Sequence, residues 1–210
     1  LPEAIVNFLA LLGWNPGDER EIFSMGELIK EFSLERVQKG GAVFNIQRLD
    51  WINCFYIRKK SVEELTRLCE PYFPESKTDF ERRKKIVALY QERLKKLSEL
   101  AELADFFFKE KLEYDKELLL WKDATGPQTK EMLEKVRTLF NGVGESEWTK
   151  ANLEKIIMPE AEKQQDRGYM LWPLRVALCG KKASPGPFEI AEVLGKDQTL
   201  ERIQEALKRM

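Results

Sequence analysis

The chemistry open to this chain is limited first by a residue type that it lacks. None of its 210 residues is histidine. Histidine is the commonest general base and a frequent metal ligand, so serine–histidine or cysteine–histidine catalysis and histidine-bound zinc are excluded within this chain. The three cysteines, Cys54, Cys69 and Cys179, are far apart and odd in number, which favours reduced, buried thiols over a disulfide framework or a zinc site. We therefore predict no metal site.

Arginine and lysine remain as the side chains that can bind a ligand. At 100° per residue, Arg93 falls in the same sector as the apolar stripe of residues 86–97. A cation there needs an internal carboxylate or an external ligand, such as a phosphate or a base edge. Arg82 and Arg83 belong to a basic run on the same predicted helix and are candidate phosphate contacts. A solvated helix face is the alternative explanation of that run.

A second cation stands in an apolar run near the carboxyl end. In WPLRVALCGKKASPGPFEIAEVLG, residues 172–195, Arg175 is the only charged residue before the two lysines. Burial without a partner would penalise its charge, so an internal carboxylate or an external anion is expected to meet it. Lys181 and Lys182 follow closely and are predicted to contact phosphates.

The same stretch predicts a helix start that is rigid and open to a ligand. Ser184 is a good N-cap and Pro185 suits the first helical position, so the free N–H groups of that helix would point outward and attract anions. Pro185, Pro187 and Phe188 would add a stiff, flat apolar surface on which bases can stack. An ordinary capped helix start after a loop is the alternative.

Helices are predicted to position all of these side chains. Strict alternation of apolar and polar residues, the signal of a strand, is nearly absent, whereas helix-start signals recur along the chain. Capping-box patterns mark three starts: Ser24 with Glu27, Ser61 with Glu64, and Thr78 with Glu81. Pro127 marks another start. The sequence therefore predicts an all-α fold.

Composition and charge set the class of protein. With 43% hydrophobic residues the chain can build real cores, and no stretch approaches the roughly 20 apolar residues of a membrane span. It begins without a basic leader and without methionine, so we predict a cytoplasmic protein and interpret the chain as a fragment of a longer one. The net charge of −1 excludes bulk basicity as a source of nucleic-acid binding, which leaves local patches.

Three stretches carry a resemblance to a known family: LPEAIVNFLALLGW, VFNIQRLDWINCFYIRK and WPLRVALCGKKASPGPFEIAEVLGKDQTLERI. In this order the chain resembles the carboxy-terminal half of bacterial glutamyl-tRNA synthetases. The family's amino-terminal half is a Rossmann-type catalytic domain with HIGH-like and KMSKS-like ATP-binding motifs, and neither motif occurs in this sequence. The resemblance therefore implies that the chain is no enzyme by itself and holds no cofactor, while ATP and Mg belong to the parent enzyme.

The resemblance also implies a division of the all-α chain into three regions. These are a helical stem-contact region over residues 1–64 and two helical-bundle anticodon-binding subdomains over residues 65–141 and 142–210. The implied anticodon contacts are Arg93, Arg175, Ser184, Pro185, Pro187 and Phe188. The implied stem contacts, which match the family's WxNxxYIR pattern, are Asn53, Tyr56 and Arg58.

We therefore expect a tRNA-recognition part of an ATP-dependent glutamate–tRNA ligase that acts in translation. Its expected partners are glutamate tRNA and the parent's amino-terminal catalytic domain. Arg93 favours an enzyme specific for glutamate tRNA, and glutamine tRNA stays open as a second partner. A monomer without membrane contact is expected. The alternatives are a helical protein-interaction module without RNA binding and a small enzyme with paired carboxylates at Glu99 and Glu102.

Overall fold

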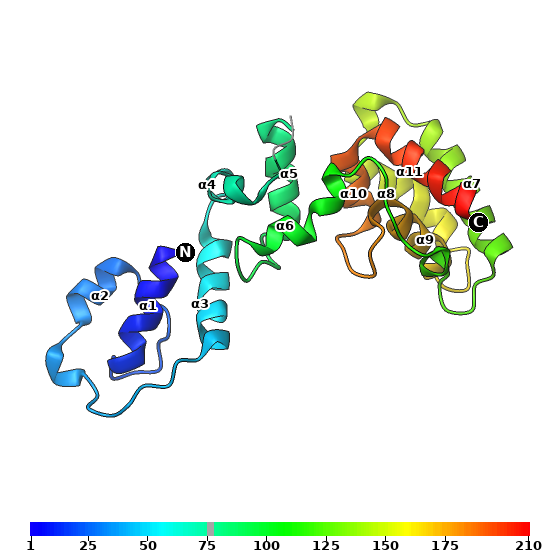
Figure 1. The fold of residues 1–210 in the computed structure, drawn as a ribbon. Coiled ribbons are helices and arrows are strands. Elements are labelled where there is room, and N and C mark those ends of the chain that lie inside the picture. Colours follow the sequence, from blue (N-terminus) through cyan, green and yellow to red (C-terminus); the bar gives the residue numbers. More distant parts are fainter. Residues whose placement is uncertain (75–77) are drawn as a thin grey trace. The chain divides into compact units, whose positions relative to one another are not determined.

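The computed structural model describes residues 1–74 and 78–210 (Figure 1). Over these residues the chain is helical and forms no strand, which confirms the all-α prediction. Its α-helices are α1 (Pro2–Gly13), α2 (Met25–Glu31), α3 (Ile46–Lys59), α4 (Val62–Cys69), α5 (Phe80–Tyr90), α6 (Glu99–Leu103), α7 (Gly126–Asn141), α8 (Lys150–Ala161), α9 (Gly168–Cys179), α10 (Pro187–Leu194) and α11 (Lys196–Arg209). Each helix of the described part falls short of the length and hydropathy that a bilayer span requires. Cys54, Cys69 and Cys179 are free thiols, as predicted.

The chain divides into two compact units, residues 1–102 and residues 103–210. This division coincides with neither of the boundaries expected near residues 64 and 142, because α4 and α5 belong to the first unit. The three-region division concerns which segments meet which part of a tRNA, and it stays a prediction.

The first unit is built on the packing of α1 against α3 and α2, and of α4 against α5 (Figure 1). Ala4 and Phe8 of α1 and Ile52 of α3 form one buried cluster. A polar network ties this cluster to the following loop. The Tyr56 hydroxyl lies 2.6 Å from the Phe23 carbonyl oxygen, and the Phe23 N–H donates to the side chain of the fully buried Asn7 at 2.8 Å.

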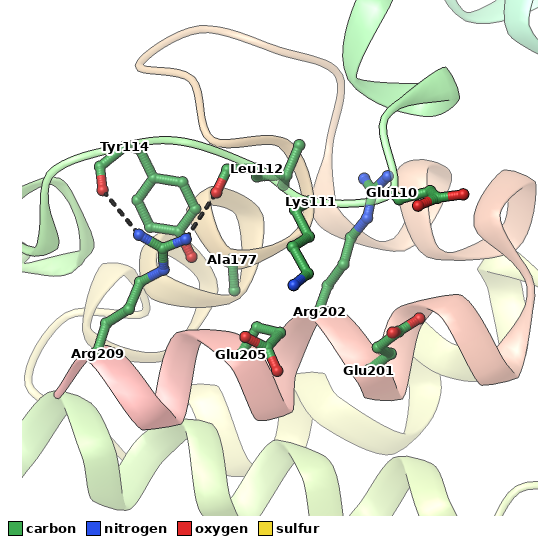
Figure 2. A pocket seen from close by; sticks show the side chains of 9 residues that line it. All are labelled: Glu110, Lys111, Leu112, Tyr114, Ala177, Glu201, Arg202, Glu205 and Arg209. Atoms are coloured by element: carbon green, nitrogen blue, oxygen red, sulfur yellow. Dashed lines mark hydrogen bonds between the residues drawn. The ribbon is translucent and has the colours of Figure 1, made fainter.

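The second unit centres on α7, α9 and α11, which pack against one another, while α10 packs against α8, α9 and α11. Two arginines of α11 attach the irregular segment around residues 106–114 to this bundle. Arg209 donates to the carbonyl oxygens of Leu112 (2.6 Å) and Tyr114 (3.3 Å), as Figure 2 shows. Arg202, only 3% exposed, donates to the carbonyl oxygens of Leu178, Phe106 (2.7 Å) and Lys109 (2.9 Å).

The helix starts follow the local signals in some places and not in others. Ser24 and Glu27 form the predicted capping box, and the Ser61 hydroxyl accepts the Glu64 N–H at 3.2 Å. Pro127 lies in the first turn of α7, as predicted. The cap predicted at Thr78 is wrong by one residue, since the Asp79 carboxylate accepts the Arg82 N–H at 2.7 Å.

Candidate nucleic-acid interface

The corner between α9 and α10 starts and ends differently from the prediction. α9 ends at Gly180, whose φ of 67° is in the left-handed region that favours glycine. α10 begins at Pro187, with Gly186 as its N-cap. The prediction that Ser184 caps this helix and Pro185 opens it is therefore wrong. The Ser184 hydroxyl instead donates to the Pro185 carbonyl oxygen at 3.0 Å.

The N-terminus of α10 already has an anion. The Glu189 carboxylate accepts the Gly186 N–H at 2.6 Å and pairs with Lys150 at 2.6 Å. A carboxylate at this position satisfies a free N–H group and opposes the positive end of the helix dipole. The expectation that this helix end is open to an external anion is therefore wrong.

The exposed part of the corner is smaller than expected. Phe188 is 6% exposed and belongs to the core, and Pro185 is buried beside it in sequence. Ser184 and Pro187 are half-buried, and Lys182 is exposed. The expectation of an exposed Phe188 ring is therefore wrong. The assignment of Ser184, Pro185, Pro187 and Phe188 to an anticodon site stays a prediction from the resemblance.

Arg175 is half-buried on α9 and is held by an aromatic ring and a backbone carbonyl. Its Cζ lies over the Trp172 ring, 4.4 Å from the centroid, and its Nη2 donates to the Lys182 carbonyl oxygen at 2.9 Å. The Trp172 ring is itself fixed, since its Nε1 donates to the Leu118 carbonyl oxygen at 2.8 Å. Over the described residues Arg175 forms no ion pair with a carboxylate. Its guanidinium is thus oriented yet not neutralised, which suits a site for an external acceptor.

The two lysines of the corner have different surroundings. Lys181 pairs with Asp105 at 2.5 Å, and Lys109 pairs with the same carboxylate at 2.5 Å. Burial works to raise the pKa of Asp105, but the hydrogen bonds from Lys109 and Lys181 outweigh it, and the pKa is lowered. Lys182 is exposed. Lys182 is therefore the lysine of this corner that is better placed for a phosphate.

Arg93 lies in the turn after α5, where its side chain is exposed. α5 ends at Tyr90, whose carbonyl oxygen accepts hydrogen bonds from the N–H groups of Arg93 (2.8 Å) and Leu94 (3.0 Å). Leu94 is fully buried. The prediction that Arg93 lies on an apolar helix face is wrong, because the helix stops before it reaches this residue. An exposed guanidinium can meet a base edge without the cost of burial.

Arg82 and Arg83 are half-buried in α5, so they do not share a helix with Arg93 as expected. Arg83 pairs with Glu70 at 2.5 Å and lies over the Phe73 ring, 5.4 Å from its centroid. Burial lowers the pKa of the Arg82 guanidinium. A phosphate would have to compete with Glu70 for Arg83, and both phosphate contacts stay predictions.

The three predicted stem contacts lie on α3 and take part in internal hydrogen bonds. Asn53 is 7% exposed, and its Nδ2 donates to the Lys95 carbonyl oxygen at 2.6 Å. Tyr56 belongs to the buried network of the first unit. Arg58 is exposed and donates from Nη2 to the Glu92 carbonyl oxygen at 2.9 Å. These contacts position α3 and the turn at residues 91–96, and the role in stem binding stays a prediction.

Sequence reasoning missed two residues that position these candidates. Trp172 lies three residues before Arg175, a spacing at which helical side chains meet, so a signal for their contact was present. Gln91 follows α5 and donates to the end of α3, and no local pattern indicates this contact. Glu99, considered for paired-carboxylate chemistry, accepts the Lys95 N–H at 2.8 Å, which is a structural role.

The pocket of Figure 2 does not add a binding site. Glu110, Glu201 and Glu205 line it together with Arg202 and Arg209, and both guanidinium groups donate to backbone carbonyls. Burial raises the pKa of Tyr114, another lining residue, to about 12. The described residues also contain no group of three or more histidine, cysteine, aspartate or glutamate side chains that could hold a metal ion.

This geometry is that of a helical protein that presents oriented cations at its surface, and comparison with known proteins defines its class. The family model described as an anticodon-binding domain matches residues 64–207. A second model, the catalytic domain of class I tRNA synthetases (E and Q), matches residues 1–51. The chain belongs to the anticodon-binding domain family.

Known ligases match the whole chain. The glutamate–tRNA ligase of Clostridium kluyveri is 39% identical over 217 residues, which cover 100% of this chain and 43% of that protein. The glutamate–tRNA ligase of Clostridium botulinum strain Hall is 40% identical and is covered to 42%. A crystal structure of a glutamate tRNA ligase from Elizabethkingia meningosepticum, in complex with its amino acid, superposes with a TM-score of 0.87 at 29% identity, over 99% of this chain and 41% of that one. The chain thus spans about two-fifths of the length of these relatives, and the matches support the RNA-recognition hypothesis, not the protein-interaction module.

Proposed function

We propose that this chain recognises the anticodon of glutamate tRNA as the carboxy-terminal part of a glutamate–tRNA ligase. The parent enzyme would attach glutamate to that tRNA in an ATP-dependent reaction, with ATP and Mg bound in its catalytic part and no chemical step in this chain. The match of residues 64–207 to the anticodon-binding family carries the proposal, because that range contains Arg93, Arg175 and the α9–α10 corner. We propose further that the protein is a cytoplasmic monomer, as the resemblance implies.

Recognition would combine two kinds of contact. Arg93 and Arg175 present guanidinium forks, which match base edges bidentately, and Lys182 presents an exposed charge to a phosphate. Ser184 and Pro187 supply the partly exposed surface of the corner. Phosphate contacts would set the position of the RNA, and the arginines would set its identity.

A filter-binding comparison tests the proposal directly. Glutamate tRNA is compared with a transcript that differs only in the anticodon, and with glutamine tRNA, over a series of salt concentrations. The chain is expected to prefer the unaltered glutamate anticodon, and its affinity is expected to fall steeply with salt, because bound cations displace counterions from phosphates. Equal affinity for all three RNAs, or no binding, would contradict anticodon recognition.

Lys182→Ala is expected to weaken all RNAs alike. One phosphate contact contributes about one unit to the slope of log affinity against log salt, so the slope should fall by about 1. Filter binding with each transcript at several salt concentrations measures both effects. Lys181→Ala is the matched control, because Lys181 is already paired with Asp105 and should change the slope less. An unchanged slope for Lys182→Ala would show that the corner does not touch phosphate.

The proposed second partner is the remainder of a class I catalytic domain in the same polypeptide. Among the described residues, 14 large hydrophobic side chains are exposed, and 12 of them lie within residues 1–51, the range matched by the catalytic-domain model. Met25 and Ile29 of α2 are 50% and 76% exposed and lie four residues apart, on one face of the helix. Exposed apolar surface of this kind marks an interface.

Ile29→Lys is expected to weaken association with a catalytic part about 10- to 100-fold, the value of burying one isoleucine side chain. Calorimetric titration of this chain with the separately produced catalytic part of the Clostridium kluyveri ligase measures the effect. Leu68→Lys, at an exposed leucine outside the matched range, is the control and should have no effect. Equal weakening by both variants, or no association of the unmodified chain, would contradict this partner.

A further inference from the structure

A buried amide joins the turn that carries Arg93 to the end of α3. Gln91, the residue at the C-terminal cap of α5, is 9% exposed. Its Nε2 lies 3.0 Å from the Ile57 carbonyl oxygen and 2.8 Å from the Lys60 carbonyl oxygen, both of which belong to the last turn and cap of α3. The carbonyl groups at a helix end lack partners within the helix, so one side-chain amide here satisfies two of them.

Two side chains of α3 hold the same turn on the other side of Arg93. The Arg58 guanidinium donates to the Glu92 carbonyl oxygen at 2.9 Å, and Asn53 Nδ2 donates to the Lys95 carbonyl oxygen at 2.6 Å. The backbone is therefore tied to α3 immediately before Arg93 and two residues after it. Between these ties Leu94 points into the core and Arg93 is exposed.

We infer that Gln91 is a positioning residue for Arg93, which sets where its guanidinium stands relative to α3. The inference rests on the proposed function of Arg93. A bidentate contact requires its donors within a fraction of an ångström of the productive position, so the backbone that carries them must be held firmly. Gln91 holds it through its side chain alone, and the hydrogen bonds of Asn53 and Arg58 complete the bracket. Because α3 also carries the predicted stem contacts, the bracket keeps stem and anticodon contacts in one register.

A series of variants at residue 91 tests the inference, with glutamate tRNA and a transcript altered at the third anticodon base as probes. The readout is the ratio of the two dissociation constants. Gln91→Met keeps length and volume but cannot donate, so the ratio should fall about 2- to 10-fold, the range for loss of one or two hydrogen bonds. Gln91→Lys can still donate to the carbonyls of a helix end and should restore most of the ratio. Arg93→Ala in the same assay reports whether Arg93 itself discriminates.

The outcomes separate this inference from the proposed function. A ratio lowered by Gln91→Met and restored by Gln91→Lys supports the inference, since a purely structural cap would change both dissociation constants equally. A ratio that Arg93→Ala lowers and Gln91→Met leaves unchanged would overturn the positioning role alone. A ratio that Arg93→Ala does not change would overturn both. If Gln91→Met loses its helical circular dichroism, Arg58→Met, at an exposed residue, replaces it, because any lost stem contact weakens both RNAs and cancels in the ratio.

Discussion

Replacing Arg93 by alanine is expected to remove about 1 to 3 kcal/mol of discrimination at one anticodon base, the usual worth of a bidentate contact. The corresponding ratio of dissociation constants changes roughly 5- to 150-fold. The residue is exposed in a turn that α3 holds in place, so its loss should cost recognition and leave the fold intact. Filter binding with transcripts that differ at single anticodon positions identifies the base.

Arg93→Lys is the matched control for this prediction. Lysine keeps the positive charge but lacks the planar fork, so it should retain affinity for RNA in general and lose the discrimination. Equal losses for every tRNA after Arg93→Ala would show that the residue only contacts phosphate. Full discrimination by the lysine variant would show that charge, not fork geometry, carries the recognition.

Arg202→Met is expected to have the largest effect on stability, lowering the free energy of unfolding of the second unit by about 3 to 5 kcal/mol. The guanidinium is 3% exposed and donates to the carbonyl oxygens of Leu178, Phe106 and Lys109. Methionine cannot donate, so these buried acceptors would lose their partner, and unpaired buried carbonyls are costly. Urea unfolding followed by far-UV circular dichroism measures the change.

Arg209→Met on the same helix is the control for Arg202→Met. Arg209 also donates to two backbone carbonyls, but it is exposed, so water can replace its hydrogen bonds (Figure 2). Its replacement should cost about 1 kcal/mol. Similar losses for the two variants would contradict the view that burial makes Arg202 a structural residue and would reopen the pocket between them as a site.

Local sequence signals predicted what depends on three or four neighbouring residues. Ser24 and Glu27 form their capping box because both partners lie within one turn of the chain. At the α9–α10 corner two local candidates were nearly equivalent, Ser184 before Pro185 and Gly186 before Pro187. Glu189, three residues after Gly186, decides for the second. This signal was present in the sequence and was not used.

The end of α5 shows where local signals stop. Apolar spacing continues past Tyr90, so the pattern predicts one long helix through Arg93. The chain turns there instead, and the Gln91 side chain binds the carboxyl end of α3, a segment far away in the sequence. Spacing reports which residues can share a face, but it does not report which distant backbone groups need a donor.

By itself the sequence determined the all-α class, the free cysteines, several helix starts and the family, because each of these depends on composition, short spacings or quoted motifs. The tertiary structure alone decided which cations remain available to a ligand. Lys181 meets Asp105 and Arg83 meets Glu70, whereas Arg175 lies over Trp172 with no carboxylate partner among the described residues. Charge pairing and burial depend on segments brought together by folding, so equal residue types in the sequence acquire unequal roles.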